Sequence, residues 1–144
     1  MTHHDEGNYR AKRHGEDAPA AEIMDAVANG ARDGKIGCAA AEAIATRLSV
    51  PPDEVGRAID LAELKISACQ LGLFGYGKGV KLIKPAESVA EDLAGEIRAA
   101  ATDGRIACTD VWAIADRRGM TRLDAACACD ALGLKIAACQ LGAF

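Results

Sequence analysis

The chain contains one unit of about fifty residues twice. Residues 22–74 and 92–144 align without a gap at a constant offset of 70, and 20 of the 53 aligned positions are identical. The identity is concentrated at the end of each copy, where LKISACQLGLF (64–74) and LKIAACQLGAF (134–144) agree at nine of eleven positions. A duplicated unit buries one core per copy or shares a core between copies, and it presents two similar surfaces.

The hydrophobic pattern of each copy predicts three short helices. In the first copy, apolar residues recur at helical spacing over 20–32 and 39–48, and a third helix begins at Pro52, which suits the first helical position. In the second copy, Thr121 and Asp124 have the spacing of a helix-capping box. The stripe expected to be buried on the third helix is Val55, Ala58, Ile59 and Ala62 in copy one, and Ala125, Ala128, Cys129 and Leu132 in copy two.

Short apolar stretches between and after the helices predict strands. Lys35-Ile36 follows the first helix, and Leu64-Lys65-Ile66 follows the third, so the two can pair within one copy. The connector GYGKGVKLIKP (75–85) predicts a glycine-rich turn, a further short strand and a proline break. The expected fold class is mainly α with short β-strands.

Domain boundaries follow from the repeat and from composition. We expect a flexible tail over residues 1–19, a first repeat with its basic connector over 20–85, and a second repeat over 86–144. The tail holds all three histidines (His3, His4 and His14). Neighbouring histidines in such a polar segment are more often solvated than metal-bound.

The order helix, strand, helix, turn, helix, strand is that of a winged helix-turn-helix. The helix pair also resembles the helix-turn-helix pattern of a small residue, a turn glycine four residues later and an apolar residue six beyond. Copy two supplies Ala115, Gly119 and Ala125 at these positions, and copy one supplies Ala45, Ser49 and Val55. The chain is thus similar to two tandem winged-helix-like repeats, with a departure at the turn of copy one.

The resemblance implies a DNA-binding transcriptional regulator. In that family the start of the third helix enters the major groove and the wing lies along the phosphate backbone. Copy one would place Pro51, Pro52 and Asp53 there, which are poor readers of DNA, and would be a packing or dimerising unit. The residues expected to contact double-stranded DNA are therefore Arg117, Arg118, Thr121 and Arg122 of copy two, with Lys78 and Lys81 of the connector.

Charge supports other interpretations equally. The chain carries a net charge of −4, whereas proteins that hold nucleic acid by phosphate neutralisation usually show a positive stripe. The arginines can offset Asp110, Asp116 and Asp124 at a solvated helix end, and the lysines can protect an exposed strand edge. The alternative function is a protein-interaction or assembly module that does not bind nucleic acid. Its partner would be another protein or a second copy of the chain in a homodimer. A third is a small-ligand or redox sensor.

The CQLGxF segment that ends each copy has two interpretations. Gln70 and Gln140 stand among apolar residues, where a buried amide needs hydrogen-bond partners, and Gly72 and Gly142 allow close backbone approach. Structurally, each segment packs where the copies need a common seam. Functionally, the segments form a ligand or partner-protein site.

No catalytic or metal-binding constellation is evident. No Ser-His or Cys-His arrangement, P-loop or CxxC occurs outside the tail, so we expect no enzyme activity, no cofactor and no metal. The six cysteines are expected to be thiols, and the carboxylates Asp53, Glu54, Asp60 and Glu63 to form a solvated face. No apolar run of about 18 residues or hydrophobic leader is present. We expect a cytoplasmic protein without membrane contact.

Overall fold

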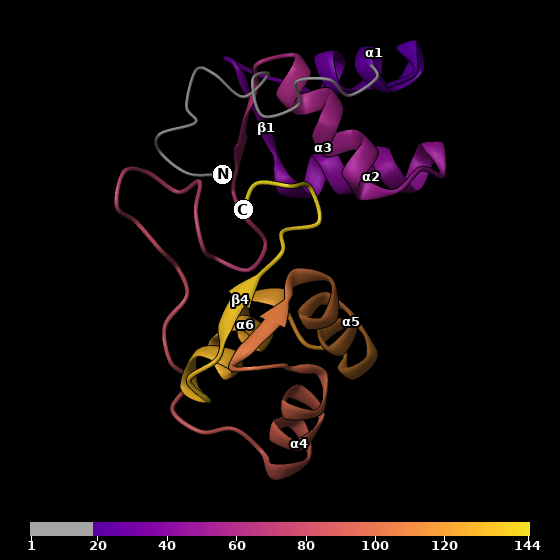
Figure 1. Ribbon diagram of the computed structural model, residues 1–144. Coiled ribbons are helices and arrows are strands. Elements are labelled where there is room, and N and C mark those ends of the chain that lie inside the picture. Colours follow the sequence, from indigo (N-terminus) through magenta and orange to yellow (C-terminus); the bar gives the residue numbers. More distant parts are fainter. Residues whose placement is uncertain (1–18) are drawn as a thin grey trace. The chain divides into compact units, whose positions relative to one another are not determined.

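The computed structural model describes residues 19–144, so the expected tail and its three histidines lie outside the described part. Residues 19–144 form six helices and four short strands, which confirms the expected mainly helical fold (Figure 1). The first repeat contains α1 (Ala21–Gly30), β1 (Lys35–Gly37), α2 (Cys38–Leu48), α3 (Pro52–Leu61) and β2 (Lys65–Ser67). The second contains α4 (Glu91–Ala100), β3 (Arg105–Ala107), α5 (Cys108–Arg118), α6 (Arg122–Ala131) and β4 (Lys135–Ala137).

The chain forms two compact units whose boundaries differ from those of the two repeats. In each repeat, the last segment belongs to the other unit. Of the residues that the structure describes, the first unit comprises 19–69 together with Gln140–Phe144, and the second comprises Gln70–Cys139. Residues 70–85, which the sequence analysis grouped with the first repeat, thus belong to the second unit. In Figure 1 the yellow end of the ribbon belongs with the purple helices. The QLG-x-F segment that follows each repeat therefore completes the opposite unit.

Two parallel strands close each unit, as the sequence predicts. Ile36 pairs with Ile66, and Ile106 pairs with Ile136 at the equivalent register. Asp33 and Gly34 both have positive φ in the tight turn before β1, a conformation that Asp-Gly sequences adopt readily. This turn brings the backbone of Gly34 to Lys65, whose N–H donates to the Gly34 carbonyl at 2.9 Å.

The turn between the second and third helices is the same in both repeats. Ser49 (φ 54°) and Gly119 (φ 65°) are left-handed and end α2 and α5, and the next N–H of each turn donates back to the helix carbonyl of Ala45 or Ala115. Pro52 occupies the first turn of α3, and the N–H of Asp124 donates to Thr121 Oγ1 at 3.0 Å, so both predicted helix starts are confirmed.

Backbone conformation repeats with the sequence. In residues 19–144, six pairs of residues separated by 70 positions have positive φ in both copies. The last pair, Gly72 (φ 76°) and Gly142 (φ 77°), shows that the two QLG segments bend alike. The other pairs are Asp33 and Asp103, Gly34 and Gly104, Ser49 and Gly119, Glu63 and Gly133, and Ala68 and Ala138.

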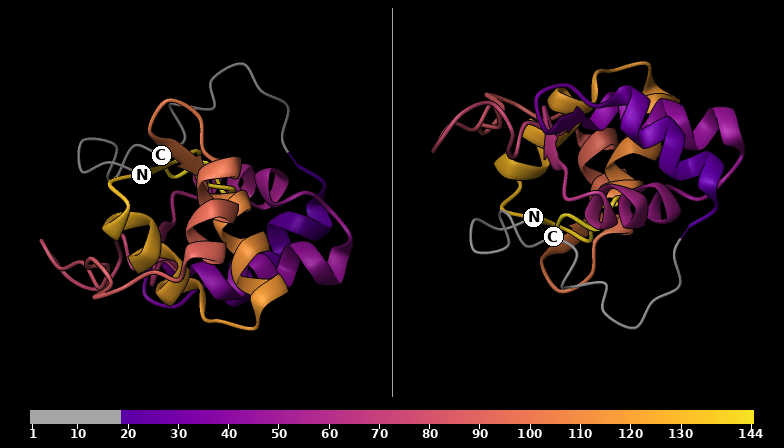
Figure 2. Two further views of the ribbon diagram at one scale, coloured as in Figure 1. Left: turned by 90° about the horizontal axis from the view of Figure 1, so that it is seen from below. Right: turned by 90° about the horizontal axis from the view of Figure 1, so that it is seen from above.

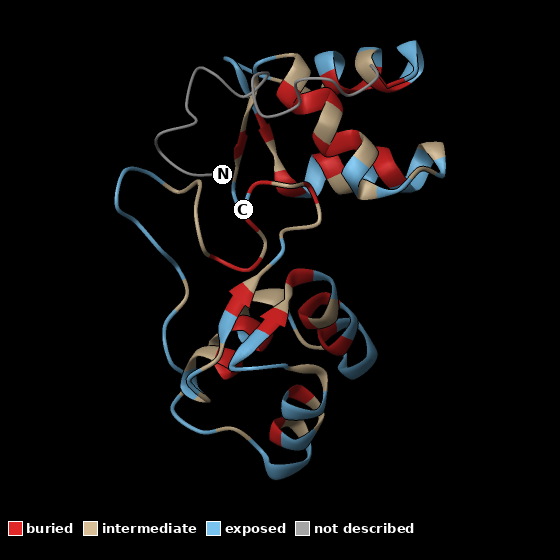
Figure 3. Cartoon of the chain, in the orientation of Figure 1, coloured by how far each residue is buried: buried red, intermediate tan, exposed pale blue. Residues whose placement is uncertain are grey.

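The core of each unit lies between its three helices. In the first unit α1 and α2 pack against α3, and in the second unit α5 packs against both α4 and α6. Figure 2 shows these helices from two further sides, and Figure 3 shows their buried faces in red. Of the predicted α3 stripe, Val55, Ala58 and Ile59 are fully buried, whereas Ala62 is half-buried.

Two sequence expectations fail. Residues 75–85 form no strand, because β1–β2 and β3–β4 are each two-stranded sheets to which this segment does not pair. Asp60 is buried, with 1% of its surface exposed, and does not lie on a solvated face. It lies one turn after Gly56 on α3, which is also buried, so this helix is covered on a second side.

None of the six helices, all in the described range 19–144, combines the length and apolar character that crossing a bilayer requires.

The left-handed turn predicts the outcome of exchanging its residues between repeats. A left-handed conformation costs a non-glycine residue about 1–2 kcal/mol, partly offset by the entropy that glycine loses on folding. Ser49→Gly should therefore raise the free energy of unfolding by about 0.5–1 kcal/mol, and Gly119→Ser should lower it by a similar amount. Urea unfolding measures both.

Gly37 provides the control for this pair. Its φ is −71°, it precedes α2, and a Cβ there would meet nothing within 4 Å. Gly37→Ser should leave stability unchanged or raise it, since serine is a good N-cap residue. Equal effects of Gly37→Ser and Gly119→Ser would contradict the account.

Candidate interaction sites on the third helices

The third helix of each unit has a buried side that its core stripe does not explain. Gly56 on α3 and its equivalent Ala126 on α6 are both buried, although each lies one residue beyond the predicted stripe at Val55 or Ala125. Glycine inside a helix costs about 0.5–1 kcal/mol relative to alanine, so Gly56 requires a reason.

Residues 140–144 provide that reason. A Cβ at Gly56 would lie 2.6 Å from the carbonyl carbon of Leu141 and nearer still to the carbonyl oxygen, a distance that real Cβ atoms do not adopt. The backbone of Leu141 therefore lies directly on α3, where only glycine leaves room. Leu141 and Ala143 are both 3% exposed in the chain. The first candidate site is the face of α3 around Gly56, occupied by residues 140–144.

The second unit holds residues 70–74 at its own third helix. Leu71 is fully buried, and a Cβ at Gly72 would lie 2.6 Å from Cδ1 of Leu123 on α6. The carbonyl of Gly72 accepts the N–H groups of Leu82 and Ile83 at 2.8 and 3.1 Å, which closes the connector into a loop. The second candidate site is the start of α6, occupied by residues 70–74.

A polar cluster fixes this second segment. Arg122 Nη1 donates to Gln70 Oε1 at 2.9 Å, and Arg122 Nη2 pairs with Asp116 at 3.1 Å. The guanidinium also lies over the ring of Trp112, 3.9 Å from its centroid. Cation–π contact and charge-assisted hydrogen bonds of this kind stabilise a fixed geometry. Arg122 therefore connects the QLG segment, the helix pair and the single tryptophan of the chain.

The neighbouring arginines pair with acids of α4. Arg117 Nη2 and Arg118 Nε each lie 2.6 Å from an oxygen of Glu96, and Arg118 Nη1 lies 3.0 Å from Asp92. These hydrogen bonds hold the pKa values of Glu96 and Asp92 below their ordinary range and raise the pKa of Arg118. All four side chains are outside the core, so the pairs orient α5 and α4 and add little stability.

The structure thus brings together some of the predicted site residues and not others. Gln70, Gly72 and Arg122 meet at the start of α6, and Thr121 caps that helix. Arg117 and Arg118 face the acids of α4. Gln140 and Gly142 lie in the first unit with Gly56. Lys78 and Lys81 are exposed in the connector loop, whose Ala86 N–H donates to the carbonyl of Cys127.

All six cysteines are free thiols. Cys38, Cys69, Cys108 and Cys129 are buried, and burial raises the pKa of Cys129 to about 11, which keeps it protonated and unreactive. Within residues 19–144, no three cysteine, histidine or acidic side chains gather closely enough to hold a metal ion.

Sequence reasoning missed several residues of these sites, among them Gly56, Trp112 and Leu141. Gly56 had a detectable signal, because a glycine in a helical pattern without a turn indicates close backbone approach. Trp112 was missed because its equivalent in the first repeat is Glu42, so the comparison of the two copies did not single it out as a site residue. Leu141 belongs to the conserved-looking QLG pattern of the two copies, but its contact with Gly56 joins residues 85 positions apart.

Comparison with protein-family models, with curated proteins and with solved structures found no match for this chain.

Removing the arginine of the polar cluster should loosen residues 70–74 and expose the indole. Trp112 is 8% exposed and is the only tryptophan, so its emission reports this cluster alone. Arg122→Ala should shift the emission to longer wavelength and lower the free energy of unfolding by about 1–2 kcal/mol. Fluorescence during urea unfolding measures both effects.

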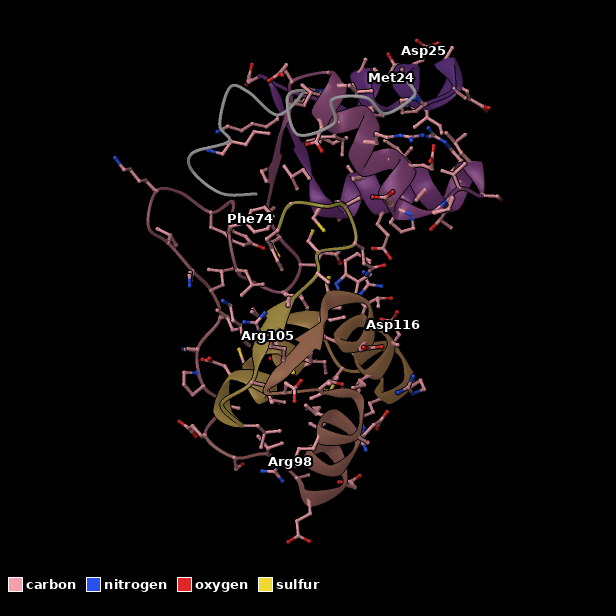
Figure 4. All side chains as sticks on the ribbon, viewed as in Figure 1. Met24, Asp25, Phe74, Arg98, Arg105 and Asp116 are labelled. Carbon is pink, nitrogen blue, oxygen red and sulfur yellow. The ribbon has the colours of Figure 1, made fainter. Side chains whose placement is uncertain are left out.

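Arg98, labelled on α4 in Figure 4, is the matched control because it is exposed and carries the same charge. Arg98→Ala should leave the emission unchanged. An Arg122→Ala spectrum identical to that of the parent chain would exclude a structural role for the stacked guanidinium.

Proposed function

We propose that this protein is a protein-interaction module whose three-helix units bind QLG-x-F segments on their third helices. The observation that carries the proposal is the contact of the Leu141 backbone with Gly56, which leaves no space for a side chain at position 56 of α3. Such close approach specifies a peptide backbone as the ligand, because an extended backbone is narrow enough to lie on a glycine.

The doubled arrangement supports this function. The first unit contains the QLG segment of the second repeat, and the second unit contains the QLG segment of the first repeat. The glycines of the two segments, Gly72 and Gly142, have the same positive φ to within one degree. The segments also bury a leucine each, Leu71 and Leu141. Alternate buried side chains combined with backbone contact are the usual basis of peptide recognition.

DNA binding by winged-helix-like repeats is the second candidate, and one observation favours it. The left-handed turn between α5 and α6, at Gly119, is the turn that a helix-turn-helix requires, and Lys78 and Lys81 are exposed. Against it, Arg117 and Arg118 pair with acids and Arg122 holds Gln70 and Asp116. Charges already neutralised by carboxylates contribute less to phosphate binding.

Titration of fluorescent duplex DNA at low and moderate salt separates the two candidates. The interaction proposal predicts no salt-dependent binding by the parent chain. Binding that weakens with salt, and that weakens at least tenfold further in Arg117→Ala combined with Arg122→Ala, would favour DNA binding instead.

A peptide titration tests the interaction proposal directly. Leu141→Asp in the full chain places a charge at a buried position and should release residues 140–144 from α3. A fluorescein-labelled peptide of residues 138–144 should then bind this variant saturably, as measured by anisotropy. Adding Gly56→Ala to the same chain should weaken peptide binding at least tenfold, because the new Cβ overlaps the peptide backbone.

Gly95 supplies the control for the glycine change. It lies within α4, and a Cβ there would meet nothing within 4 Å, so Gly95→Ala should leave peptide binding unchanged while favouring the helix. Peptide binding that is indifferent to Gly56→Ala, or absent up to millimolar peptide, would contradict the proposed function.

A further inference from the structure

The α3 site receives its segment across a very short connection. β4 ends at Ala137 in the second unit, and only Ala138 and Cys139 stand between it and Gln140, which belongs to the first unit. The segment is therefore supplied to α3 by a part of the chain that packs elsewhere. Nothing in the α3 contact itself requires that donor and acceptor belong to the same molecule.

The connection is also strained. Ala138 has φ 55°, in the left-handed region, where a residue with a Cβ is disfavoured. Short connections under strain favour the exchange of identical elements between copies, because an exchanged assembly keeps the same contacts and can relax the hinge.

Residues 70–74 are less suited to exchange. The carbonyl of Gly72 accepts hydrogen bonds from the N–H groups of Leu82 and Ile83, and the N–H of Ala86 donates to the backbone carbonyl of Cys127 on α6. These hydrogen bonds hold the segment and the chain that follows it within the second unit. Exchange is thereby confined to the α3 site and residues 140–144.

We infer that the partner of the α3 site is a second copy of this chain, with residues 140–144 of each copy packed on α3 of the other. This inference rests on the proposed function and adds the identity of the partner. Within one chain the attached segment has a high effective concentration, so exchange between copies grows with protein concentration and competes with closure. Variants in which residues 140–144 pack less well on α3 of their own chain should therefore show the exchange between copies.

Two defective variants that complement one another provide the test. The Gly56→Ala chain has a weakened α3 site but still carries residues 140–144, whereas the Leu141→Asp chain keeps an intact α3 but has a defective segment. Closure within one chain is weakened in both variants. In an equimolar mixture, the segment of the first chain should occupy α3 of the second and give a species of twice the 14.9 kDa chain mass.

Sedimentation velocity should show association in the mixture at least tenfold tighter than for either variant alone. The control is the double variant, Gly56→Ala with Leu141→Asp, which should form no complex with the Gly56→Ala chain. A Gly95→Ala chain mixed with parent chain should behave as the parent does.

Each result is decisive. A mixture that stays monomeric while the Leu141→Asp chain binds the 138–144 peptide overturns the exchange and leaves the proposed function standing. Failure of peptide binding overturns both. Circular dichroism verifies that Leu141→Asp is folded, and if it is not, Leu141→Ala replaces it, since that change removes the buried side chain without adding a charge.

Discussion

The packing of a QLG segment on a third helix is the interaction on which the rest of this structure depends. Each repeat has about fifty residues and is rich in alanine, so it removes little apolar surface from water by itself. A fully buried leucine contributes about 1.5–3 kcal/mol, which is a large share of the roughly 5–15 kcal/mol that stabilises a typical domain. Leu71 and Leu141 each provide such a contribution, and each provides it to the opposite unit.

This interaction also bears on function. The start of the third helix is the surface that a winged-helix protein would offer to DNA. In this chain Gly56 of α3 is covered by Leu141, and Arg122 of α6 is engaged by Gln70 and Asp116. The close approach of the Leu141 backbone to Gly56 on α3 is the observation behind the proposed interaction module.

Local features of the fold could be predicted from sequence because they depend on neighbouring residues. The helix starts at Pro52 and Thr121 and the left-handed turn at Gly119 follow from short-range patterns, whereas the pairing of Ile36 with Ile66 joins two locally predicted strands across two helices. The strand expected in 75–85 did not form: the segment pairs with neither two-stranded sheet, and the N–H groups of Leu82 and Ile83 donate instead to the carbonyl of Gly72.

The sites were harder to predict because their contacts are distant in sequence. The near-identity of the two QLG segments indicated that they matter, yet it could not say which unit each would complete. Asp60 was misplaced for the same reason, since its burial accompanies that of Gly56 on a side of α3 that the core pattern leaves uncovered. The stacking of Arg122 on Trp112 has no counterpart in the first repeat, where the equivalent residues are Pro52 and Glu42.

The central claim is that residues 140–144 pack on the helix of the first repeat and not on that of their own. Nuclear Overhauser contacts of the Gly56 α-protons in the parent chain test it most directly. The account predicts cross-peaks from Gly56 to Leu141 and Gly142. Cross-peaks from Leu141 to residues 122–131, with none to Gly56, would contradict it.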